Sequence, residues 1–248
     1  MIQNWSFLEK SYVFATFASA AYKDDCSLDF KKYNLKNYVF FTNDGAQGHA
    51  ACNNEDLVIT CRGTQPTQVN DLYADLDTIP KRHAEGWVHE GFRREARKLL
   101  PMIINYVRQY PNRTIWLTGH SLGAAMALYI TQELEYEGLN PTMLFTYGCP
   151  RLGNQTYVNC IKTEHHRYVN CNDVVTTVPP TWLGFRHDGN LHYINFYGNI
   201  RPLTTWQTIK DKWRAHKRSW LSGKWFDAID DHSVDLYASK IKNIDLNK

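Results

Sequence analysis

The chain has 248 residues, of which 21% are charged and 14% aromatic, and its formal net charge is +3. This composition is that of an ordinary globular protein with a weakly basic surface, so it excludes a disordered chain and gives no reason to expect a nucleic-acid partner. A chain of this length buries a substantial core, and α/β folds of this size are routinely one domain. We therefore predict a single domain over residues 1–248.

The N-terminal segment does not have the form of a secretory signal. It lacks a basic start, and Glu9 and Lys10 interrupt its apolar stretch, although residues 18–20 resemble a cleavage site. Apolar side chains recur at helical spacing over residues 13–21, which predicts a helix packed on the body of the protein. No run approaches the roughly 18 apolar residues of a membrane span. We expect a soluble protein of undetermined compartment, cytoplasmic or exported by a non-classical route.

Strand-like apolar runs alternate with helical patterns along the chain. Strands are expected at 38–42, 57–61, 114–118, 143–148 and 167–170. A long helix is expected over residues 92–107, where Pro101 should kink the helix or shift its boundary. Strands alternating with helices predict a mostly parallel sheet covered on both faces.

The chain contains six cysteines, and no two of them form a C-x-x-C pair. Cys61 and Cys149 fall inside apolar runs that are typical of buried thiols. Free cysteines are the expected state, and a Cys160 to Cys171 bridge is left open by the sequence.

The sequence Gly119-His120-Ser121-Leu122-Gly123 lies between a strand-forming run and a helix-forming run. In this context a G-x-S-x-G pattern predicts a nucleophile elbow, in which a strained turn exposes the serine hydroxyl. Ser121 is thus the candidate nucleophile. The Leu122 N–H should lie at the start of the following helix, where unpaired amides favour a developing negative charge. The alternative is a serine in an ordinary glycine-rich turn.

With these pieces in place, the chain resembles the class 3 lipases, the α/β-hydrolase family that includes the fungal triacylglycerol lipases. The motifs that carry the resemblance occur in the family's order between about residues 57 and 242: Arg62-Gly63-Thr64, Asp75-Leu76, Val88-His89-Glu90-Gly91-Phe92, the Ser121 pentapeptide, Thr146-Tyr147-Gly148-Cys149-Pro150-Arg151-Leu152-Gly153-Asn154, Asn172-Asp173-Val174-Val175 and Asp231-His232-Ser233. The resemblance implies an α/β-hydrolase fold, with a mostly parallel central sheet flanked by helices.

The resemblance also implies a Ser-His-Asp triad, with Asp173 orienting His232 as the general base. Without the family resemblance, the alternatives are that Asp173 is a turn-forming residue and that His232 is a histidine at a helix start. His187 and His192 also follow Asp173 and are the strongest rivals for the base.

For the oxyanion hole, the family pattern implies the Thr64 amide and hydroxyl beside the Leu122 amide. The remaining histidines are assigned structural roles. His120 should point away from the serine by strand alternation, and His89 should support the fold near the site. His165 and His166 are adjacent and should face different ways, so neither a metal nor a cofactor is expected.

Two segments depart from the family pattern. Residues 65–71 after the oxyanion position are polar, with only Val69, Leu72 and Tyr73 nearby to face a pocket, whereas lids of interfacially activated members have an apolar underside. The second departure combines tryptophans with basic residues: Trp206, Trp213 and Trp220 with Lys210, Arg214, Lys217 and Arg218. That composition suits peripheral contact with an anionic membrane. The alternative is an edge helix that buries its tryptophans against the body.

The leading hypothesis is a hydrolase of lipid carboxylic esters, of triacylglycerol lipase or phospholipase A1 type. An esterase of soluble acyl or aromatic esters is the alternative within the same chemistry, and the polar lid would suit it. A non-catalytic binding module on the same fold is the alternative from another class.

A polar lid buries little apolar surface in its closed state, so contact with lipid does little to stabilise the open state. We expect modest or absent interfacial activation. The rate should therefore rise smoothly as a short-chain ester passes its solubility limit, and a sharp jump there would contradict this hypothesis.

Overall fold

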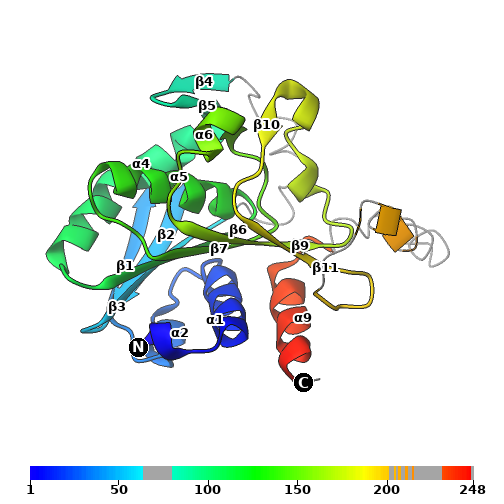
Figure 1. Ribbon diagram of the computed structural model, residues 1–248. Coiled ribbons are helices and arrows are strands. Elements are labelled where there is room, and N and C mark those ends of the chain that lie inside the picture. Colours follow the sequence, from blue (N-terminus) through cyan, green and yellow to red (C-terminus); the bar gives the residue numbers. More distant parts are fainter. Residues whose placement is uncertain are drawn as a thin grey trace.

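The computed structural model describes residues 1–63, 80–200, 204, 206–207, 210–211, 214 and 231–246. Over this part, the chain builds a seven-stranded sheet with helices on both faces and a small four-stranded sheet beside it (Figure 1). The fold is the α/β arrangement with a mostly parallel central sheet that the sequence predicted.

The strands of the large sheet are β1 (Lys36–Asn43), β2 (Ala46–Cys52), β3 (Asp56–Cys61), β6 (Thr114–His120), β7 (Met143–Tyr147), β9 (Glu164–Asn170) and β11 (Asn190–Ile194). Their spatial order is β1-β2-β3-β6-β7-β9-β11. The β1–β2 and β2–β3 pairs are antiparallel, and every pair from β3 to β11 is parallel. Parallel strands bring their carboxyl ends to one edge, which is where ligand sites of such sheets form.

The helices are α1 (Phe7–Ala20), α2 (Ser27–Lys31), α4 (Glu90–Gln109), α5 (Leu122–Tyr136), α6 (Gln155–Val158) and α9 (Val234–Leu246). Short 3-10 turns are η1 (Ile2–Asn4), η3 (Val175–Thr177) and η4 (Thr181–Leu183). The small sheet has the order β10-β8-β5-β4, with β4 (Pro80–His83), β5 (Gly86–His89), β8 (Gly153–Asn154) and β10 (Phe185–Arg186).

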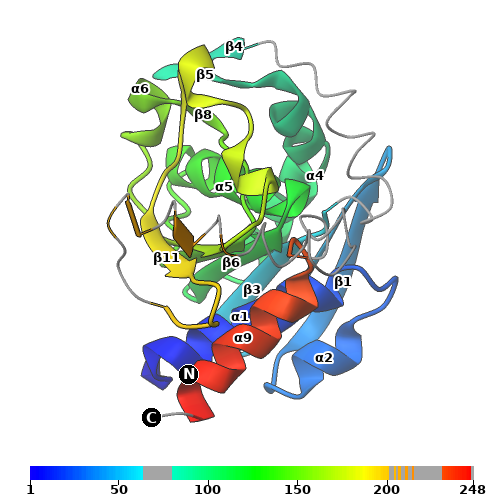
Figure 2. The ribbon, with the colours of Figure 1, turned by 90° about the vertical axis from the view of Figure 1, so that its right-hand side faces the viewer.

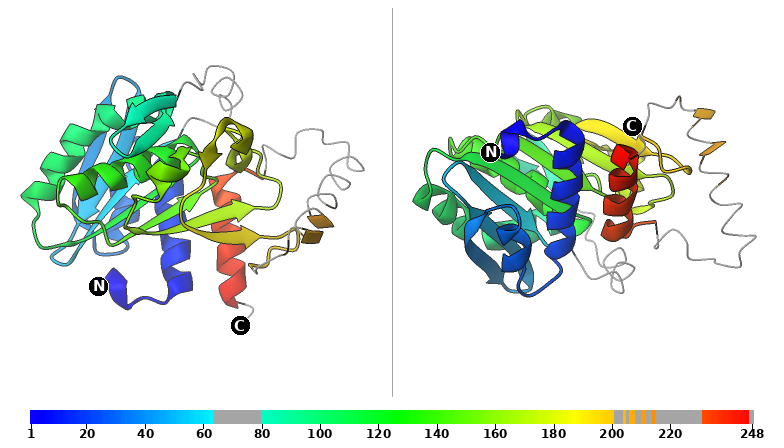
Figure 3. Two further views of the ribbon diagram at one scale, coloured as in Figure 1. Left: turned by 45° about the horizontal axis from the view of Figure 1, so that its top comes forward. Right: turned by 90° about the horizontal axis from the view of Figure 1, so that it is seen from below.

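The helices divide between the two faces of the large sheet. In Figures 1 and 2, α1, α2 and α9 lie on one face, while α4, α5, α6 and the small sheet lie on the other. Seen from below, the first and last helices, α1 and α9, run side by side (Figure 3, right), and they are in contact. Segments from the two ends of the described chain therefore meet under the sheet.

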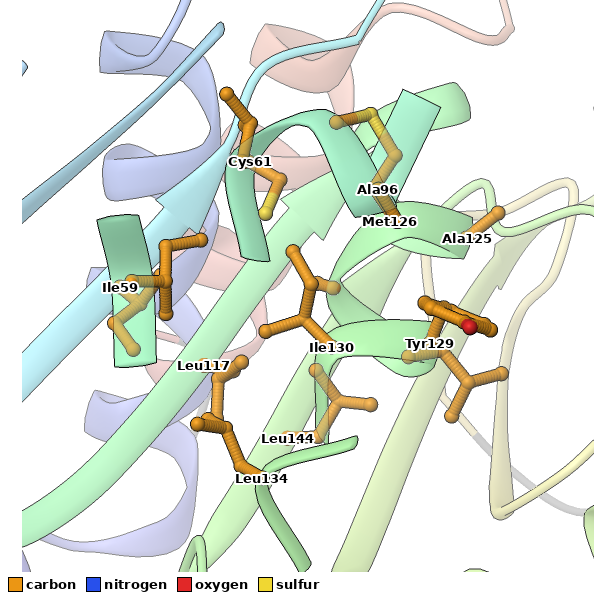
Figure 4. Close-up of a cluster of buried hydrophobic side chains, with 14 of the residues drawn as sticks. Ile59, Cys61, Ala96, Leu117, Ala125, Met126, Tyr129, Ile130, Leu134 and Leu144 are labelled. Atoms are coloured by element: carbon orange, nitrogen blue, oxygen red, sulfur yellow. The ribbon is translucent and has the colours of Figure 1, made fainter. Parts of the chain in front are cut away.

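The core between the sheet and α4 and α5 is made of aliphatic side chains that interdigitate across the layers (Figure 4). Ile59 and Leu117 come from neighbouring strands, and Ile130 and Leu134 from α5. All four are fully buried. This packing fixes the position of α5 over β6, and so the geometry of the turn that joins them.

The structure differs from the sequence prediction at several elements. The strands β2 and β11 and the four strands of the small sheet were not predicted, and β9 begins three residues earlier than expected. The sequence of β2 is rich in Ala and contains Gly, which gives weak strand propensity, yet all but one of its residues are buried. At Pro101 a kink or a shifted helix boundary was expected; the shifted boundary was wrong, because α4 continues through this residue.

Buried histidines make the fold sensitive to acid. Burial lowers the pKa of His187 to about 2 and that of His192 to about 4, and it lowers the pKa of His120 well below its usual value. The unfolded chain protonates these groups near pH 6.5, so below that pH it binds more protons than the folded protein. Stability should therefore fall as the pH falls from about 6.5, with His187 alone costing about 2 kcal/mol by pH 5.

Urea unfolding at pH 7 and pH 5 tests this prediction. The His187→Gln variant keeps a donor for the Thr176 carbonyl that His187 Nε2 contacts at 2.8 Å, so its stability should depend less steeply on pH. Equal pH dependence in the variant and the wild type would contradict the assignment.

Candidate active site

Ser121 occupies the turn between β6 and α5 with φ 57° and ψ −130°, a strained conformation for a residue with a side chain. The glycines on either side make the turn sterically feasible. A Cβ at Gly119 would lie 2.3 Å from the Gly123 carbonyl oxygen, and a Cβ at Gly123 would lie 2.2 Å from the Cys61 carbonyl oxygen. The predicted nucleophile elbow is therefore present in the backbone.

The Leu122 amide lies at the first position of α5, next to Ser121. The first N–H groups of a helix have no intrahelical acceptor, and the helix dipole adds positive potential there. On the other side, the chain that leads to Thr64 passes close to the serine, because a Cβ at Gly63 would lie 3.3 Å from Ser121 Cβ. Thr64 itself lies outside the described residues.

Asp173 and His232 are brought together although they lie 59 positions apart in the chain. His232 Nδ1 lies 2.9 Å from Asp173 Oδ2, and both side chains are buried. A carboxylate accepts hydrogen bonds, so Nδ1 carries the proton and Nε2 presents a lone pair. Nε2 is buried and has no hydrogen-bond partner among the described residues. The histidine is therefore held in the tautomer of a general base.

The carboxylate of Asp173 is held by two further donors that the sequence did not predict. The Tyr237 hydroxyl donates to Asp173 Oδ2 at 2.6 Å, and the Val175 N–H donates to Oδ1 at 2.9 Å. Tyr237 lies on α9, five positions after His232. Its hydroxyl also accepts the Asn170 N–H at 2.9 Å, so one tyrosine ties the end of β9 to the acid. No pattern in the sequence pointed to Tyr237, because its role is a buried hydrogen bond between distant segments.

His120 contacts His232 through both its ring and a hydrogen bond. Its Nε2 lies 2.6 Å from the His232 carbonyl oxygen, and its Nδ1 lies 2.8 Å from the Tyr22 hydroxyl. Burial, and then the neighbouring His232, lower the pKa of His120 well below its usual value. The ring is therefore neutral, with Nε2–H donating to the carbonyl and Nδ1 accepting from Tyr22. These contacts agree with the structural role that was expected for His120.

No hydrogen bond joins Ser121 Oγ to His232 Nε2. Both atoms are buried, and neither has a partner in the part of the chain that the structure describes. In proteins without bound substrate, such bonds are commonly long and tighten when substrate binds. The rings of His120 and His232 are nevertheless packed with centroids 4.4 Å apart, and Ser121 follows His120 directly in the chain. His232 thus lies beside the Ser121 turn.

The rival histidines lie elsewhere. His187 Nε2 contacts the Thr176 carbonyl, and His192 Nε2 lies 3.0 Å from His166 Nδ1. His165 forms a second buried pair with Asp188, Nδ1 to Oδ2 at 2.8 Å, and its other nitrogen lies 2.7 Å from Thr146 Oγ1. Neither rival contacts the Asp173 carboxylate. His165 and His166 face different ways, as predicted.

Several other predicted residues have clear outcomes. His89 is buried, stacks on Phe92 and accepts the Phe92 N–H at the start of α4, which agrees with the predicted structural role. All six cysteines are free thiols, Cys160 and Cys171 included. The described residues contain no group of three potential metal ligands, and none of their helices is long and apolar enough to span a bilayer.

The predicted polar lid, residues 65–71 with Val69, and the nearby Leu72 and Tyr73 lie outside the described residues. So do four members of the basic tryptophan segment: Trp213, Lys217, Arg218 and Trp220. Trp206, Lys210 and Arg214 are exposed, and Lys210 Nζ lies 5.4 Å from the centre of the Trp206 ring.

Comparison with known proteins agrees with this geometry. The family described as Lipase (class 3) matches residues 58–182, which include Ser121 and Asp173. The chain belongs to the class 3 lipase family. His232 lies beyond the matched segment, so its assignment depends on the contact with Asp173.

Among curated relatives, the lipase of Rhizomucor miehei is 32% identical over 152 residues, covering 56% of this chain and 41% of that protein. Toxin TseL of Vibrio cholerae is 28% identical over 131 residues, covering 51% of this chain and 20% of the toxin. A secreted mono- and diacylglycerol lipase of Malassezia globosa is 35% identical over 115 residues, covering 42% of this chain and 37% of that protein. The matched segments thus span less than half the length of these relatives.

Among solved structures, the Rhizomucor miehei lipase propeptide complex superimposes with a TM-score of 0.65 at 26% identity, covering 77% of this chain and 69% of that one. A triacylglycerol lipase whose catalytic centre is described as a serine protease triad has the same TM-score and identity. That match covers 75% of this chain and 80% of the other. These neighbours share the α/β-hydrolase architecture.

Gly148 packs closely against Asp173 and His232, so adding a side chain there tests how much the geometry of this pair matters. This residue has φ +60°, and a Cβ there would lie 2.7 Å from Asp173 Oδ2 and 2.8 Å from His232 Cε1. Gly148→Ala should displace the pair and reduce kcat at least about 100-fold, a typical cost of misplacing reacting groups by about 1 Å.

Gly138→Ala is the matched control, because Gly138 has φ +72° and a Cβ there would have no atom within 4 Å. Both variants acquire backbone strain of about 1 kcal/mol, but only Gly148→Ala should lose ester hydrolysis. Equal activity in the two folded variants would show that Gly148 does not border the reacting groups.

Proposed function

We propose that this protein is a serine hydrolase that cleaves carboxylic esters of lipids, of triacylglycerol lipase or phospholipase A1 type. The observation that carries the proposal is the buried contact of His232 Nδ1 with Asp173 Oδ2, which leaves Nε2 unpartnered beside the strained Ser121 turn. Membership of the class 3 lipase family supports the choice of lipid esters. So does the naming of several relatives as lipases.

In the proposed reaction, Ser121 Oγ attacks the ester carbonyl carbon while His232 Nε2 takes the hydroxyl proton. The tetrahedral intermediate collapses when the ester C–O bond breaks, and the same proton passes to the leaving alcohol. A water molecule then attacks the acyl-serine, again giving its proton to Nε2. The carboxylic acid leaves, and Ser121 regains its proton.

Asp173 stabilises the imidazolium that forms at each step and keeps the Nδ1 proton in place. The negative charge on the substrate oxygen would be stabilised by the Leu122 amide and, as the family pattern implies, by Thr64. Removal of one such donor typically costs about 3 kcal/mol of transition-state stabilisation.

Labelling with a fluorophosphonate probe tests the enzyme assignment. The wild type should be labelled at Ser121, and Ser121→Ala should lose both labelling and hydrolysis, with kcat reduced about 10⁶-fold. Asp173→Asn should reduce kcat about 10⁴-fold, because the amide no longer selects the correct imidazole tautomer.

Asp188→Asn is the control for Asp173→Asn, since Asp188 also contacts a buried histidine at 2.8 Å, but that histidine is His165 and not His232. Its activity should stay close to that of the wild type. Labelling that persists in Ser121→Ala would refute the proposed nucleophile. A panel of triacylglycerol, phospholipid and soluble esters then identifies the substrate class.

We also propose peripheral contact with anionic membranes through Trp206, Trp213, Trp220, Lys210, Arg214, Lys217 and Arg218. The exposure of Trp206, Lys210 and Arg214 supports this assignment. In sedimentation with liposomes, the protein should bind anionic vesicles more tightly than neutral ones. Replacing the four basic residues by Gln should reduce that difference, and an unchanged preference would argue against this segment.

A further inference from the structure

The Tyr22 hydroxyl lies between the turn of the candidate nucleophile and the chain just after β3. It contacts Nδ1 of His120, the residue directly before Ser121, at 2.8 Å. His120 in turn contacts the His232 carbonyl through Nε2 at 2.6 Å. A Cβ at Gly63 would collide with the same tyrosine hydroxyl, so the space around it is tightly filled. A residue just after α1 is thus linked to the backbone of the candidate base.

The direction of both hydrogen bonds follows from their chemistry. A carbonyl oxygen only accepts, so His120 Nε2 carries the proton that points to His232. Burial, and then the neighbouring His232, lower the pKa of His120, so its ring is neutral and Nδ1 presents a lone pair. The Tyr22 hydroxyl is therefore the donor to Nδ1, and burial raises the pKa of Tyr22, which keeps the proton on its oxygen. The tyrosine thus selects the imidazole tautomer that donates to the His232 backbone.

A second chain of the same kind holds the backbone from which Tyr22 projects. The last carbonyls of a helix have no intrahelical partner, and the Ala21 carbonyl at the end of α1 accepts from His49 Nε2 at 3.2 Å. His49 Nδ1 lies 2.8 Å from the Tyr38 hydroxyl, and burial lowers the pKa of His49, so this ring is neutral too. Two tyrosine-histidine-carbonyl links therefore run in series from β1 and β2 towards His232.

We propose that Tyr22 is a positioning residue of the site, which sets the placement of His232 through the imidazole of His120. The inference rests on the proposed ester hydrolysis and adds a support for the base besides its contact with Asp173. Asp173 holds the ring of His232 through Nδ1, whereas His120 holds its main chain. Ring and backbone are thus fixed separately, as a catalytic group that must be held to within about 0.5 Å requires.

The chemistry of the contact distinguishes positioning from simple packing. Without the Tyr22 hydroxyl, His120 can carry its proton on Nδ1 instead. The lone pairs of Nε2 and of the His232 carbonyl oxygen would then face each other across the present 2.6 Å contact and repel. The start of α9 would move away from His120 and take the base with it, whereas Ser121 would keep the place that core packing gives it.

Tyr22→Phe removes the hydroxyl and keeps the ring. We expect kcat for a soluble short-chain nitrophenyl ester to fall about tenfold, near the upper end of what one lost neutral hydrogen bond costs. KM should change less than about twofold, because the base acts in the transition state. The NMR signal of the His232 Nδ1 proton should shift, since the ring moves relative to Asp173. An unchanged kcat or an unchanged signal in the folded variant would overturn the proposal.

Tyr106→Phe is the matched control. Tyr106 is buried, and its hydroxyl donates to the Asn37 carbonyl at 2.7 Å, between α4 and β1. This variant should lose about as much stability in urea as Tyr22→Phe and yet keep the wild-type kcat. An equal loss of kcat in the two variants would show that only stability is affected, and would overturn the positioning role.

Two substitutions of His120 test the path to the base. A Gln amide can lie near the position of the imidazole Nε2 and an Asn amide near that of Nδ1, so only His120→Gln keeps a donor for the His232 carbonyl. His120→Gln should retain kcat to within about threefold, whereas His120→Asn should lose about tenfold. Equal activity in these two variants would overturn the path through the His232 backbone.

The positioning role and the proposed function fail in different ways. If the wild type cleaves no ester, the proposed function fails, whereas the His232 Nδ1 signal in Tyr22→Phe and Tyr106→Phe still tests how the ring is placed. If the wild type cleaves esters and Tyr22→Phe does so at the same rate, only the positioning role is refuted.

Discussion

The hydrogen bond from His232 Nδ1 to Asp173 Oδ2 is the contact on which the rest of the site depends. Its partners are 59 positions apart in the chain, so the bond exists only if the end of β9 and the start of α9 are held together. Two buried contacts do this. Asn170 Nδ2 donates to the Asp231 carbonyl at 2.8 Å, and the Tyr237 hydroxyl links Asn170 to Asp173. Because α9 also packs against α1, the base is positioned by both ends of the described chain.

The second constraint is steric and is imposed by glycine. The Ser121 turn exists only because Gly119 and Gly123 let β6, α5 and the end of β3 approach at distances that a Cβ would forbid. Gly148 then leaves room for the acid and base at the end of β7. The strain at Ser121 is offset by the aliphatic core between α5 and the sheet, which fixes the elbow from below. Core packing, backbone strain and site geometry are thus one connected arrangement.

Short sequence patterns predicted the features that are formed by residues close together in the chain. The elbow was readable because strand, serine turn and helix are contiguous, and the parallel sheet followed from the alternation of elements. Asp173 and His232 were found only through the family resemblance, since a turn-forming Asp and a helix-start His carry no signal that they meet. Tyr237, Asn170 and Tyr22 were missed for the same reason: their roles are buried hydrogen bonds between distant segments. The strand β2 was missed because burial, rather than intrinsic propensity, holds it in the sheet.

The most direct test of the account is a crystal structure of the protein inhibited by a long-chain alkyl phosphonate. We predict a covalent bond from Ser121 Oγ to phosphorus, with His232 Nε2 within hydrogen-bond reach of the phosphonate and His232 Nδ1 still bound to Asp173. The Leu122 N–H should donate to the phosphoryl oxygen at about 2.7–3.1 Å. Phosphorus attached to a different residue, or His232 turned away from Ser121 in the inhibited protein, would contradict the convergence of these three side chains.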